Sequence, residues 1–213
     1  AEHGLFAKKG LGQHFLLDLN LTAKIAGLTD AKPGDHIIEV GPGPGGLTRA
    51  LLDTGADVTA IERDARIVPL LEQMRDAYGG RLDWVEDDAL KVDEISLLRG
   101  ERTIIASNLP YNISTELLVK WLTATSRYWT RLVLMFQREV GDRILAAPGS
   151  KTYGRLSVLA QAASTPRLGF HLPARAFTPP PKVDSSVLVF EAGPTLVENT
   201  GALDKVTAAA IGQ

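Results

Sequence analysis

Short apolar segments alternate along the chain with segments whose apolar residues recur every three or four positions. The apolar segments predict strands at residues 36–40, 57–62, 82–85, 103–107 and 132–136. The amphipathic segments predict helices at residues 47–53, 65–78, 116–122, 138–146 and 156–163. Strands that alternate with helices predict an α/β fold, with a mostly parallel central sheet that is covered on both faces.

Two further strands are predicted near the end of the chain, at residues 168–172 and 186–190, and no helical pattern separates them. We therefore expect them to form an antiparallel pair at an edge of the sheet. The fully apolar segment Val133-Leu134-Met135-Phe136 is instead typical of a central strand buried on both faces. A short helix is expected within residues 198–210.

Length and composition limit the class of protein. The chain has 213 residues, 45% hydrophobic and 23% charged, which is enough for one soluble α/β domain with at most a small appendage. Because the sequence has no cysteine, disulfides, cysteine-based zinc sites and cysteine nucleophiles are excluded. No apolar run approaches the ~18 residues of a membrane span, and residues 1–12 do not resemble a secretory signal. We expect a cytoplasmic protein with no membrane partner.

The charge pattern leaves the partner open. The net charge of −2 does not favour nucleic acid, because phosphate binding usually requires an excess of basic residues. The charge is uneven, however, since residues 127–155 carry six basic side chains and only two acidic ones. This basic run is interpreted either as a solvated helix face or as a surface for an anionic partner.

A glycine loop, Glu39-Val40-Gly41-Pro42-Gly43-Pro44-Gly45-Gly46, joins the first predicted strand to the first predicted helix. Glycines there let the backbone approach a bound nucleotide and offer it N–H groups. Glu62 ends the next strand 21 positions beyond Gly41, near the ~20-residue spacing at which a carboxylate meets ribose hydroxyls. The loop satisfies both G-x-G-x-x-G, through Gly41, Gly43 and Gly46, and E-x-G-x-G-x-G, starting at Glu39. Both patterns predict a cofactor that contains a nucleoside.

Two polar segments at later strand ends favour S-adenosylmethionine as that cofactor. Asp87 and Asp88 follow the third predicted strand, where a carboxylate can meet the adenine amine. Asp88 is equally suited to cap a short helical turn. The segment Asn108-Leu109-Pro110-Tyr111 follows the fourth predicted strand.

The residue types of this second segment suit methyl transfer to the N6 amine of adenine, which is a poor nucleophile because its lone pair is delocalised into the ring. The Asn108 side-chain oxygen and the backbone carbonyl of Leu109 or Pro110 can accept hydrogen bonds from the amine and favour a pyramidal nitrogen. Pro110 fixes the backbone, and Tyr111 offers a ring for stacking the base, a contact worth ~1–3 kcal/mol. No strong general base is needed and no metal site is expected. The alternative is a loop in which Asn and Pro only form a turn.

Three segments together resemble the ribosomal RNA adenine N6,N6-dimethyltransferases, which modify adjacent adenosines near the 3′ end of small-subunit rRNA. They are Lys9-Gly10-Leu11-Gly12-Gln13-His14-Phe15-Leu16, the glycine loop with Asn108-Leu109-Pro110-Tyr111-Asn112-Ile113-Ser114, and Phe177-Thr178-Pro179-Pro180-Pro181-Lys182-Val183-Asp184-Ser185. The resemblance runs in order from about residue 8 to residue 190. It implies a Rossmann-like methyltransferase fold, S-adenosylmethionine as methyl donor, and small-subunit rRNA, within an immature subunit, as the partner. A monomer is expected by default.

The same resemblance implies roles for single residues. It assigns to the cofactor site Gln13, His14, Leu16, Gly41, Gly43, Glu62, Asp88 and Asn108. Within this set, Gly41 would contact the methionine portion, Glu62 the ribose and Asp88 the adenine. Asn108 would also touch the target amine, and Phe177 would stack on the target base opposite Tyr111, although core packing is the alternative for Phe177. One departure is His14, where the family usually has asparagine.

The resemblance also implies two regions. Residues 1–192 are expected to form the catalytic domain, and residues 193–213 the incomplete start of a small helical RNA-binding domain.

Other functions remain open on the sequence alone. The related dimethyltransferases of large-subunit rRNA, which confer antibiotic resistance, share the glycine loop and an Asn-x-Pro-Tyr type of site. DNA adenine methyltransferases are more distant, since they usually have proline where Leu109 stands. The chain could instead act mainly as a factor that binds an immature subunit. A nicotinamide-dependent dehydrogenase would explain the glycines, but no Tyr-x-x-x-Lys or His–Asp arrangement supports it.

Overall fold

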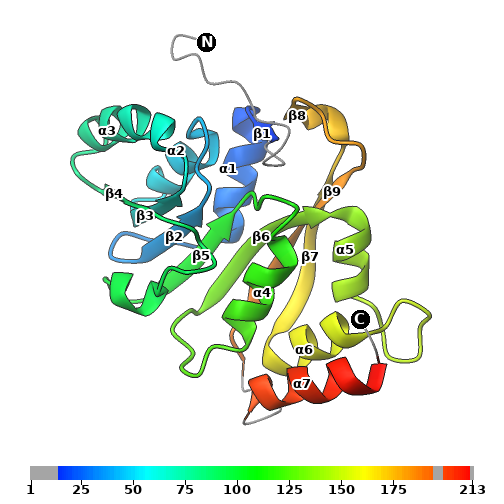
Figure 1. The fold of residues 1–213 in the computed structure, drawn as a ribbon. Helices are drawn as coiled ribbons and strands as arrows, with labels where there is room; N and C mark the ends of the chain where they lie inside the picture. The colour runs from blue at the N-terminus through cyan, green and yellow to red at the C-terminus, as the bar shows by residue number, and fades with distance from the viewer. Residues whose placement is uncertain (1–13, 194–198, 212–213) are drawn as a thin grey trace.

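The computed structural model describes residues 14–193 and 199–211. Seven strands form one sheet in the order β4-β3-β2-β5-β6-β9-β7 (Figure 1). Their bounds are β2 His36–Val40, β3 Asp57–Glu62, β4 Leu82–Glu86, β5 Thr103–Ser107, β6 Arg131–Gln137, β7 Thr165–Leu172 and β9 Ser185–Glu191. The strands from β2 to β6 are parallel, whereas β9 is antiparallel to both of its neighbours. The predicted α/β fold with a mostly parallel sheet is confirmed.

The predicted antiparallel pair near the end of the chain is also confirmed, but only one of its strands lies at the edge. β9 lies between β6 and β7, so that β7 forms the edge of the sheet. The burial of side chains explains this order. The apolar residues of β9 are buried on both faces, as in a central strand, whereas β7 carries several exposed side chains.

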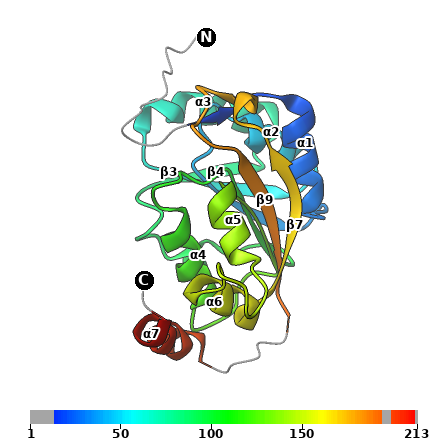
Figure 2. The same ribbon diagram turned by 90° about the vertical axis from the view of Figure 1, so that its right-hand side faces the viewer.

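Helices cover both faces of the sheet, as Figures 1 and 2 show. One layer contains α1 (Leu19–Leu28), α2 (Gly46–Leu52) and α3 (Val68–Ala77), and the other contains α4 (Ser114–Leu122), α5 (Arg138–Ile144) and α6 (Arg155–Ala163). Successive residues of β6 alternate between the two layers, because side chains along a strand point to opposite faces. Val133 and Met135 pack with the first layer, and Leu134 and Phe136 with the second. Within the described ranges, no helix is both long and apolar enough to cross a bilayer.

Three elements were not predicted from the local pattern. Helix α1 begins after Asp18, whose carboxylate accepts hydrogen bonds from the backbone N–H groups of Asn20 and Leu21. The two-residue strands β1 (Phe15–Leu16) and β8 (Phe177–Thr178) pair with each other antiparallel. This pairing brings the segment before α1 alongside the proline-rich segment that follows β8.

The helix predicted near the end of the chain is confirmed as α7 (Thr200–Ile211), which packs against α6 (Figure 2). Arg155 of α6 makes two hydrogen bonds of 2.8 Å to the carboxylate of Asp204 in α7. Two parallel bonds of this kind fix the relative orientation of the two helices better than a single contact would.

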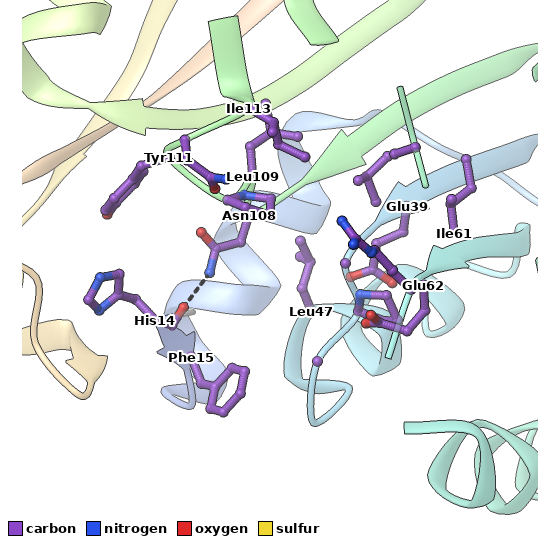
Figure 3. A pocket seen from close by; sticks show the side chains of 18 of the residues that line it. His14, Phe15, Glu39, Leu47, Ile61, Glu62, Asn108, Leu109, Tyr111 and Ile113 are labelled. Atoms are coloured by element: carbon purple, nitrogen blue, oxygen red, sulfur yellow. Dashed lines mark hydrogen bonds between the residues drawn. The ribbon is translucent and has the colours of Figure 1, made fainter. Parts of the chain in front are cut away.

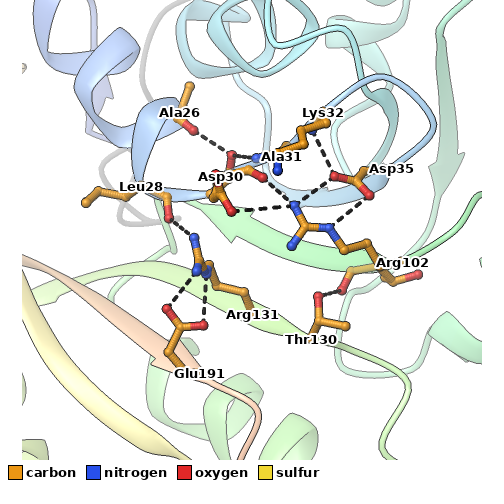
Figure 4. Close-up of polar contacts among 12 residues, drawn as sticks. Ala26, Leu28, Asp30, Ala31, Lys32, Asp35, Arg102, Thr130, Arg131 and Glu191 are labelled. Atoms are coloured by element: carbon orange, nitrogen blue, oxygen red, sulfur yellow. Dashed lines mark hydrogen bonds and ion pairs between the residues drawn. The ribbon is translucent and has the colours of Figure 1, made fainter.

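Most of the basic side chains of residues 127–155 have partners, so this run does not form a continuous basic surface. Arg131 pairs with Glu191 at 2.9 Å and also donates to the carbonyl of Leu28, which ties the end of α1 to the sheet (Figure 4). Arg138 and Arg143 each pair with an acidic residue one turn away in α5. Arg155 is engaged by α7 as described above. The interpretation as a solvated helix face fits α5, whereas Arg131 and Arg155 are engaged by β9 and α7.

Candidate active site

A pocket of about 330 Å³ opens at the carboxyl ends of the parallel strands (Figure 3). Open α/β sheets bind their ligands at this edge, because the loops that follow neighbouring strands meet there. Nearly all of the residues assigned from the sequence to cofactor and catalysis line it, namely His14, Leu16, Gly41, Gly43, Glu62, Asp88, Asn108, Leu109, Pro110 and Tyr111. Gln13 lies outside the described residues.

The glycine loop needs its glycines for conformation and for close packing. Gly41 and Gly43 have φ angles of +69° and +52°, in the left-handed region that side chains disfavour. A Cβ atom at Gly43 would lie 3.1 Å from the ring of Phe15, and one at Gly46 would lie 2.7 Å from the carbonyl oxygen of Leu16. The loop and the start of α2 therefore lie directly against β1, with no room for side chains between them.

Two buried glutamates line the pocket beside the glycine loop, Glu39 at the end of β2 and Glu62 at the end of β3 (Figure 3). Burial, with a smaller contribution from the neighbouring Glu62, raises the pKa of Glu39 to about 8, while the nearby Thr48 hydroxyl acts in the opposite direction. Oε2 of Glu39 is buried with no hydrogen-bond partner among the described residues, and so is the hydroxyl of Thr48. Burial also raises the pKa of Glu62, while Oε1 of this residue accepts a hydrogen bond of 2.8 Å from the N–H of Asp64.

The turn after β4 forms another wall of the pocket. Oδ1 of Asp88 accepts a hydrogen bond of 3.0 Å from the N–H of Leu90, so part of this carboxylate does cap the turn, as one interpretation of the sequence proposed. The carboxylate of Asp87 accepts from the N–H of Asp88 at 2.7 Å. Asp88 also lines the pocket and is only partly buried, so capping the turn and facing a ligand are compatible.

The loop after β5 is held by contacts from several segments. The side-chain amide of Asn108 donates a hydrogen bond of 2.9 Å to the backbone carbonyl of His14 (Figure 3). The carbonyl of Pro110 accepts from the N–H of Ile113 at 3.1 Å. No described residue donates to Oδ1 of Asn108 or to the carbonyl of Leu109. These two oxygens are therefore among the acceptors that this loop leaves for a ligand.

Tyr111 and His14 lie side by side at the other end of this loop. Their ring centroids are 5.5 Å apart and their planes are inclined by 31°. The Tyr111 hydroxyl and the Ser185 hydroxyl are 2.6 Å apart, and burial raises the pKa of the phenol. Nδ1 of His14 lies 2.8 Å from the carbonyl oxygen of Pro179, to which it donates in the tautomer that is protonated there. The sequence suggested none of these contacts, because they join residues far apart in the chain.

Phe177 is placed differently from the other predicted site residues. Its side chain is 2% exposed, packs in the core with the first layer of helices, and is not among the residues that line the pocket. Through the β1–β8 pairing, Phe177 lies opposite Leu16, which does line the pocket. Its stacking role stays a prediction, and in this structure the ring is a core residue.

The structure adds pocket residues that the sequence reasoning had not assigned. Phe15, Leu47, Leu90 and Ile113 supply apolar walls, and the exposed Arg63 lies beside Glu62. Apolar walls with few polar groups are typical of sites that bind a nucleoside. Phe15 could have been noticed from its place inside the motif that contains Gln13 and His14, but the other four carry no signal apart from their neighbours.

A known protein family matches this chain along almost its whole length. The model of the family described as "Ribosomal RNA adenine dimethylase" matches residues 5–212. Two curated relatives share the name "Ribosomal RNA small subunit methyltransferase A". The protein from Maricaulis maris is 54% identical over 100% of this chain and 75% of its own length. The protein from Phenylobacterium zucineum is 57% identical over 99% of this chain and 74% of its own length.

Solved structures agree with this match. A dimethyladenosine transferase from Plasmodium falciparum superposes with a TM-score of 0.83 and 27% identity, covering 94% of this chain and 71% of that one. The 23S rRNA methyltransferase ErmE superposes with a TM-score of 0.69, also at 27% identity, covering 91% of this chain and 76% of that one. The N-terminal domain of EvdMO1, solved with S-adenosylhomocysteine bound, has a TM-score of 0.53 at 15% identity and so shares only the fold.

Proposed function

The chain belongs to the ribosomal RNA adenine dimethylase family, and we propose that it dimethylates N6 of two adjacent adenosines near the 3′ end of small-subunit rRNA. The methyl donor is S-adenosylmethionine, and the reaction serves ribosome biogenesis. The observation that carries the proposal is a pair of oxygens, Oδ1 of Asn108 and the carbonyl of Leu109, to which no residue of the described ranges donates; both residues line the same pocket as the glycine loop. The small-subunit assignment is supported by relatives of that name at 54% and 57% identity.

The pocket fits the methyl donor in both charge and shape. Oε2 of Glu39, which is buried and has no hydrogen-bond partner within the described part of the chain, offers a carboxylate to the cationic methionine portion, next to the backbone of Gly41 and Gly43. Glu62 lies at the end of the next strand, where it can accept hydrogen bonds from both ribose hydroxyls. Asp88 faces the adenine amine. We assign Gln13, His14 and Leu16 to the same site, and of these His14 and Leu16 line the pocket. When bound, S-adenosylmethionine supplies an electrophilic methyl group.

The loop after β5 orients and activates the target amine. Because the Asn108 amide nitrogen is engaged by the carbonyl of His14, the Asn108 oxygen is the end of the amide that faces the substrate. This oxygen and the carbonyl of Leu109 accept the two amine hydrogens, which favours a pyramidal nitrogen with a localised lone pair. Pro110 keeps the loop backbone in place. After methyl transfer, the cationic product amine loses its proton to water, so no side chain is assigned as a strong base.

Tyr111 acts as a stacking surface and not as a base. Burial raises the pKa of its phenol, and its hydroxyl is hydrogen-bonded to Ser185, so the ring stays neutral at physiological pH. The partly buried ring lines the pocket, where an extruded adenine can stack on it. The target adenine would stack between the rings of Tyr111 and Phe177 if the base extended to Phe177 or if the Phe177 ring moved out of the core.

We propose that the reaction needs no metal, because hydrogen bonds to the loop after β5 activate the target amine. We further propose that residues 1–192 form the catalytic domain, that residues 193–213 begin a helical RNA-binding region, and that the enzyme acts as a cytoplasmic monomer on an immature small subunit. The chain spans about three quarters of the length of the relatives that it matches.

The main alternative is methylation of large-subunit rRNA. It is supported by the likeness to the 23S rRNA methyltransferase ErmE. We favour the small subunit, because the curated relatives named for the small subunit are 54% and 57% identical to this chain, whereas ErmE is 27% identical.

Methyl transfer from radiolabelled S-adenosylmethionine to immature small subunits, with large subunits as the control substrate, tests the proposal. Dimethyladenosine found only in small-subunit rRNA is the expected result, whereas label in large-subunit rRNA would support the alternative. The Asn108→Ala variant should lose transfer by ~10²–10³-fold, as when a catalytic hydrogen-bond partner is removed. It should keep its affinity for the subunit. Wild-type activity in the Asn108→Ala variant would contradict the catalytic role of Asn108. If the wild-type protein binds small subunits but methylates neither small- nor large-subunit rRNA, the result would indicate a binding factor.

A further inference from the structure

A lysine on α4 holds the turn that forms the adenine side of the pocket. Nζ of Lys120 donates hydrogen bonds to the carbonyls of Ala89 at 2.8 Å and Val92 at 2.6 Å. The same ammonium bonds to Oε1 of Glu94 at 2.8 Å. One cation therefore makes two short hydrogen bonds to the backbone of the turn and a third to the side chain of Glu94, which follows the turn. These three bonds use all of the donors that an ammonium has.

The partners of Lys120 are buried, which makes this arrangement different from a surface ion pair. The side chain of Glu94 is 3% exposed, and its Oε1 also accepts a hydrogen bond of 2.9 Å from the indole N–H of the buried Trp121. Burial and the adjacent Glu94 carboxylate raise the pKa of Tyr128, which lies against the same group. A buried charge with several hydrogen bonds is held in one geometry, because any displacement leaves a partner unsatisfied.

The turn that Lys120 holds contributes directly to the pocket. Asp88, Ala89 and Leu90 all line it. The carbonyl of Asp88 accepts from the N–H groups of Lys91 and Val92, and its carboxylate accepts from the N–H of Leu90. These bonds give the turn its internal shape, and the buried side chains of Ala89 and Val92 pack it against the helix layer that contains α4. Lys120 adds directional hydrogen bonds from α4 to the backbone carbonyls of the same two residues.

Helix α4 also carries the loop that activates the target amine. The helix begins at Ser114, directly after that loop, and the Ser114 hydroxyl donates to the carbonyl of Tyr111 at 3.1 Å. Residues 114 and 120 lie within two turns of one another on the same rigid helix. The helix therefore connects the wall beside Asn108 with the wall beside Asp88.

We propose that Lys120 is a positioning residue of the adenine subsite, and that it keeps Asp88 in register with the catalytic loop through α4. The proposal rests on the proposed function, in which Asp88 recognises the adenine amine of the methyl donor. Lys120 does not touch the ligand; it acts through the two turn carbonyls. An arginine at this position could not replace it, because a planar guanidinium cannot aim its donors at three acceptors in the way that an ammonium does.

The test compares two ligands that differ at the edge of the base that Asp88 would recognise. Isothermal calorimetry measures the affinity of S-adenosylhomocysteine and of S-inosylhomocysteine, in which an oxo group replaces the amine and N1 carries a hydrogen. The wild-type protein should prefer S-adenosylhomocysteine by about tenfold or more, as expected for one hydrogen bond to a charged group. The Lys120→Met/Glu94→Gln variant removes both charges and keeps an acceptor for Trp121. Its preference should fall to about threefold or less, while the affinity for S-inosylhomocysteine changes little.

The control and the outcomes separate this proposal from the proposed function. Lys91→Met removes an exposed ammonium from the same turn and should leave both affinities unchanged. An unchanged preference in the double variant would overturn the role of Lys120. An equal loss for both ligands together with a lower melting temperature would also overturn it, because that result indicates a purely structural role. If the wild-type protein binds neither ligand, the proposed function itself fails.

Discussion

Replacing Glu39 with glutamine should stabilise the ligand-free protein by an amount that grows with pH. Burial raises the pKa of this carboxyl to about 8 in the folded protein, against 4.5 for an unperturbed glutamate. Between these two values the folded state keeps a proton that the unfolded chain has lost. The stability of the wild-type protein therefore falls as pH rises through this window, by ~1.4 kcal/mol for each pH unit. Glutamine is neutral throughout and removes this dependence.

The magnitude follows from the width of the window. At pH 5 the ionisation of Glu39 should change the free energy of unfolding by less than ~1 kcal/mol between the two proteins. At pH 7 the variant should be more stable than the wild type by at most about 3 kcal/mol. Above pH 8 the difference should stay constant, because the carboxyl is then ionised in both states. Any fixed difference between the amide and the protonated carboxyl appears equally at every pH. The slope is therefore the quantity that matters.

Urea unfolding at pH 5, 6, 7 and 8 measures this slope, with Glu72→Gln as a matched control on an exposed glutamate of α3. The free energy of unfolding of Glu72→Gln should depend on pH in the same way as that of the wild-type protein. A stability difference for Glu39→Gln that does not vary between pH 5 and 8 would refute the reasoning, because it would mean that Glu39 is already ionised in the ligand-free protein.

The same residue links stability to the methyl donor. If the ligand ammonium meets the Glu39 carboxylate, binding at pH 7 should release close to one proton, because a neighbouring positive charge favours the ionised form. Calorimetry of S-adenosylmethionine binding in buffers of different ionisation enthalpy measures this release. Glu39→Gln should show no release and should bind more weakly. Proton release in the variant equal to that of the wild type would assign the proton to another group.

Three further predictions concern single residues. Glu62→Ala should weaken S-adenosylmethionine binding by about tenfold or more through loss of a charged acceptor for the ribose, and unchanged affinity in calorimetry would remove that assignment. Phe177→Ala should reduce methyl transfer more than cofactor binding. Because the ring is buried, the variant should also lower the free energy of unfolding, measured in urea, by about 3–5 kcal/mol. Equal losses of transfer and binding would leave only the packing role of Phe177. Burial lowers the pKa of His36 to about 4, so the protein should lose up to about 3 kcal/mol as pH falls from 6.5 to 4. His36→Gln should flatten this part of the urea-unfolding profile, and an unaltered profile would contradict the shift.

The parallel part of the sheet could be predicted because its information is local. Each strand from β2 to β6 is a short apolar segment, and the strands alternate with amphipathic helices or loops. Positions that needed long-range information were missed. β1 and β8 have two residues each and exist only because Leu16 and Phe177 pair across most of the chain. The basic run was ambiguous for the same reason, since Arg131 and Arg155 find their partners in β9 and α7.

The pocket, too, could be predicted in part from local patterns, whereas the rest depends on long-range contacts. Residue types at strand ends located the pocket, because the carboxyl ends of parallel strands must meet at one edge of the sheet. Which atoms remain available there depends on contacts that no local pattern contains. The sequence left the carbonyls of Leu109 and Pro110 as equal candidates for the second acceptor. The structure favours Leu109, because the carbonyl of Pro110 closes the turn to Ile113.

The contact between His14 and Asn108 explains how a departure from the family pattern can be compatible with the proposed activity. The Asn108 amide is oriented by the backbone carbonyl of His14, and not by its side chain. Any residue at position 14 that keeps the backbone of β1 paired with β8 can supply this carbonyl. The imidazole instead packs beside Tyr111 and bonds to the carbonyl of Pro179. Histidine in place of asparagine therefore changes the neighbourhood of the stacking residue and leaves the orientation of the catalytic amide unchanged.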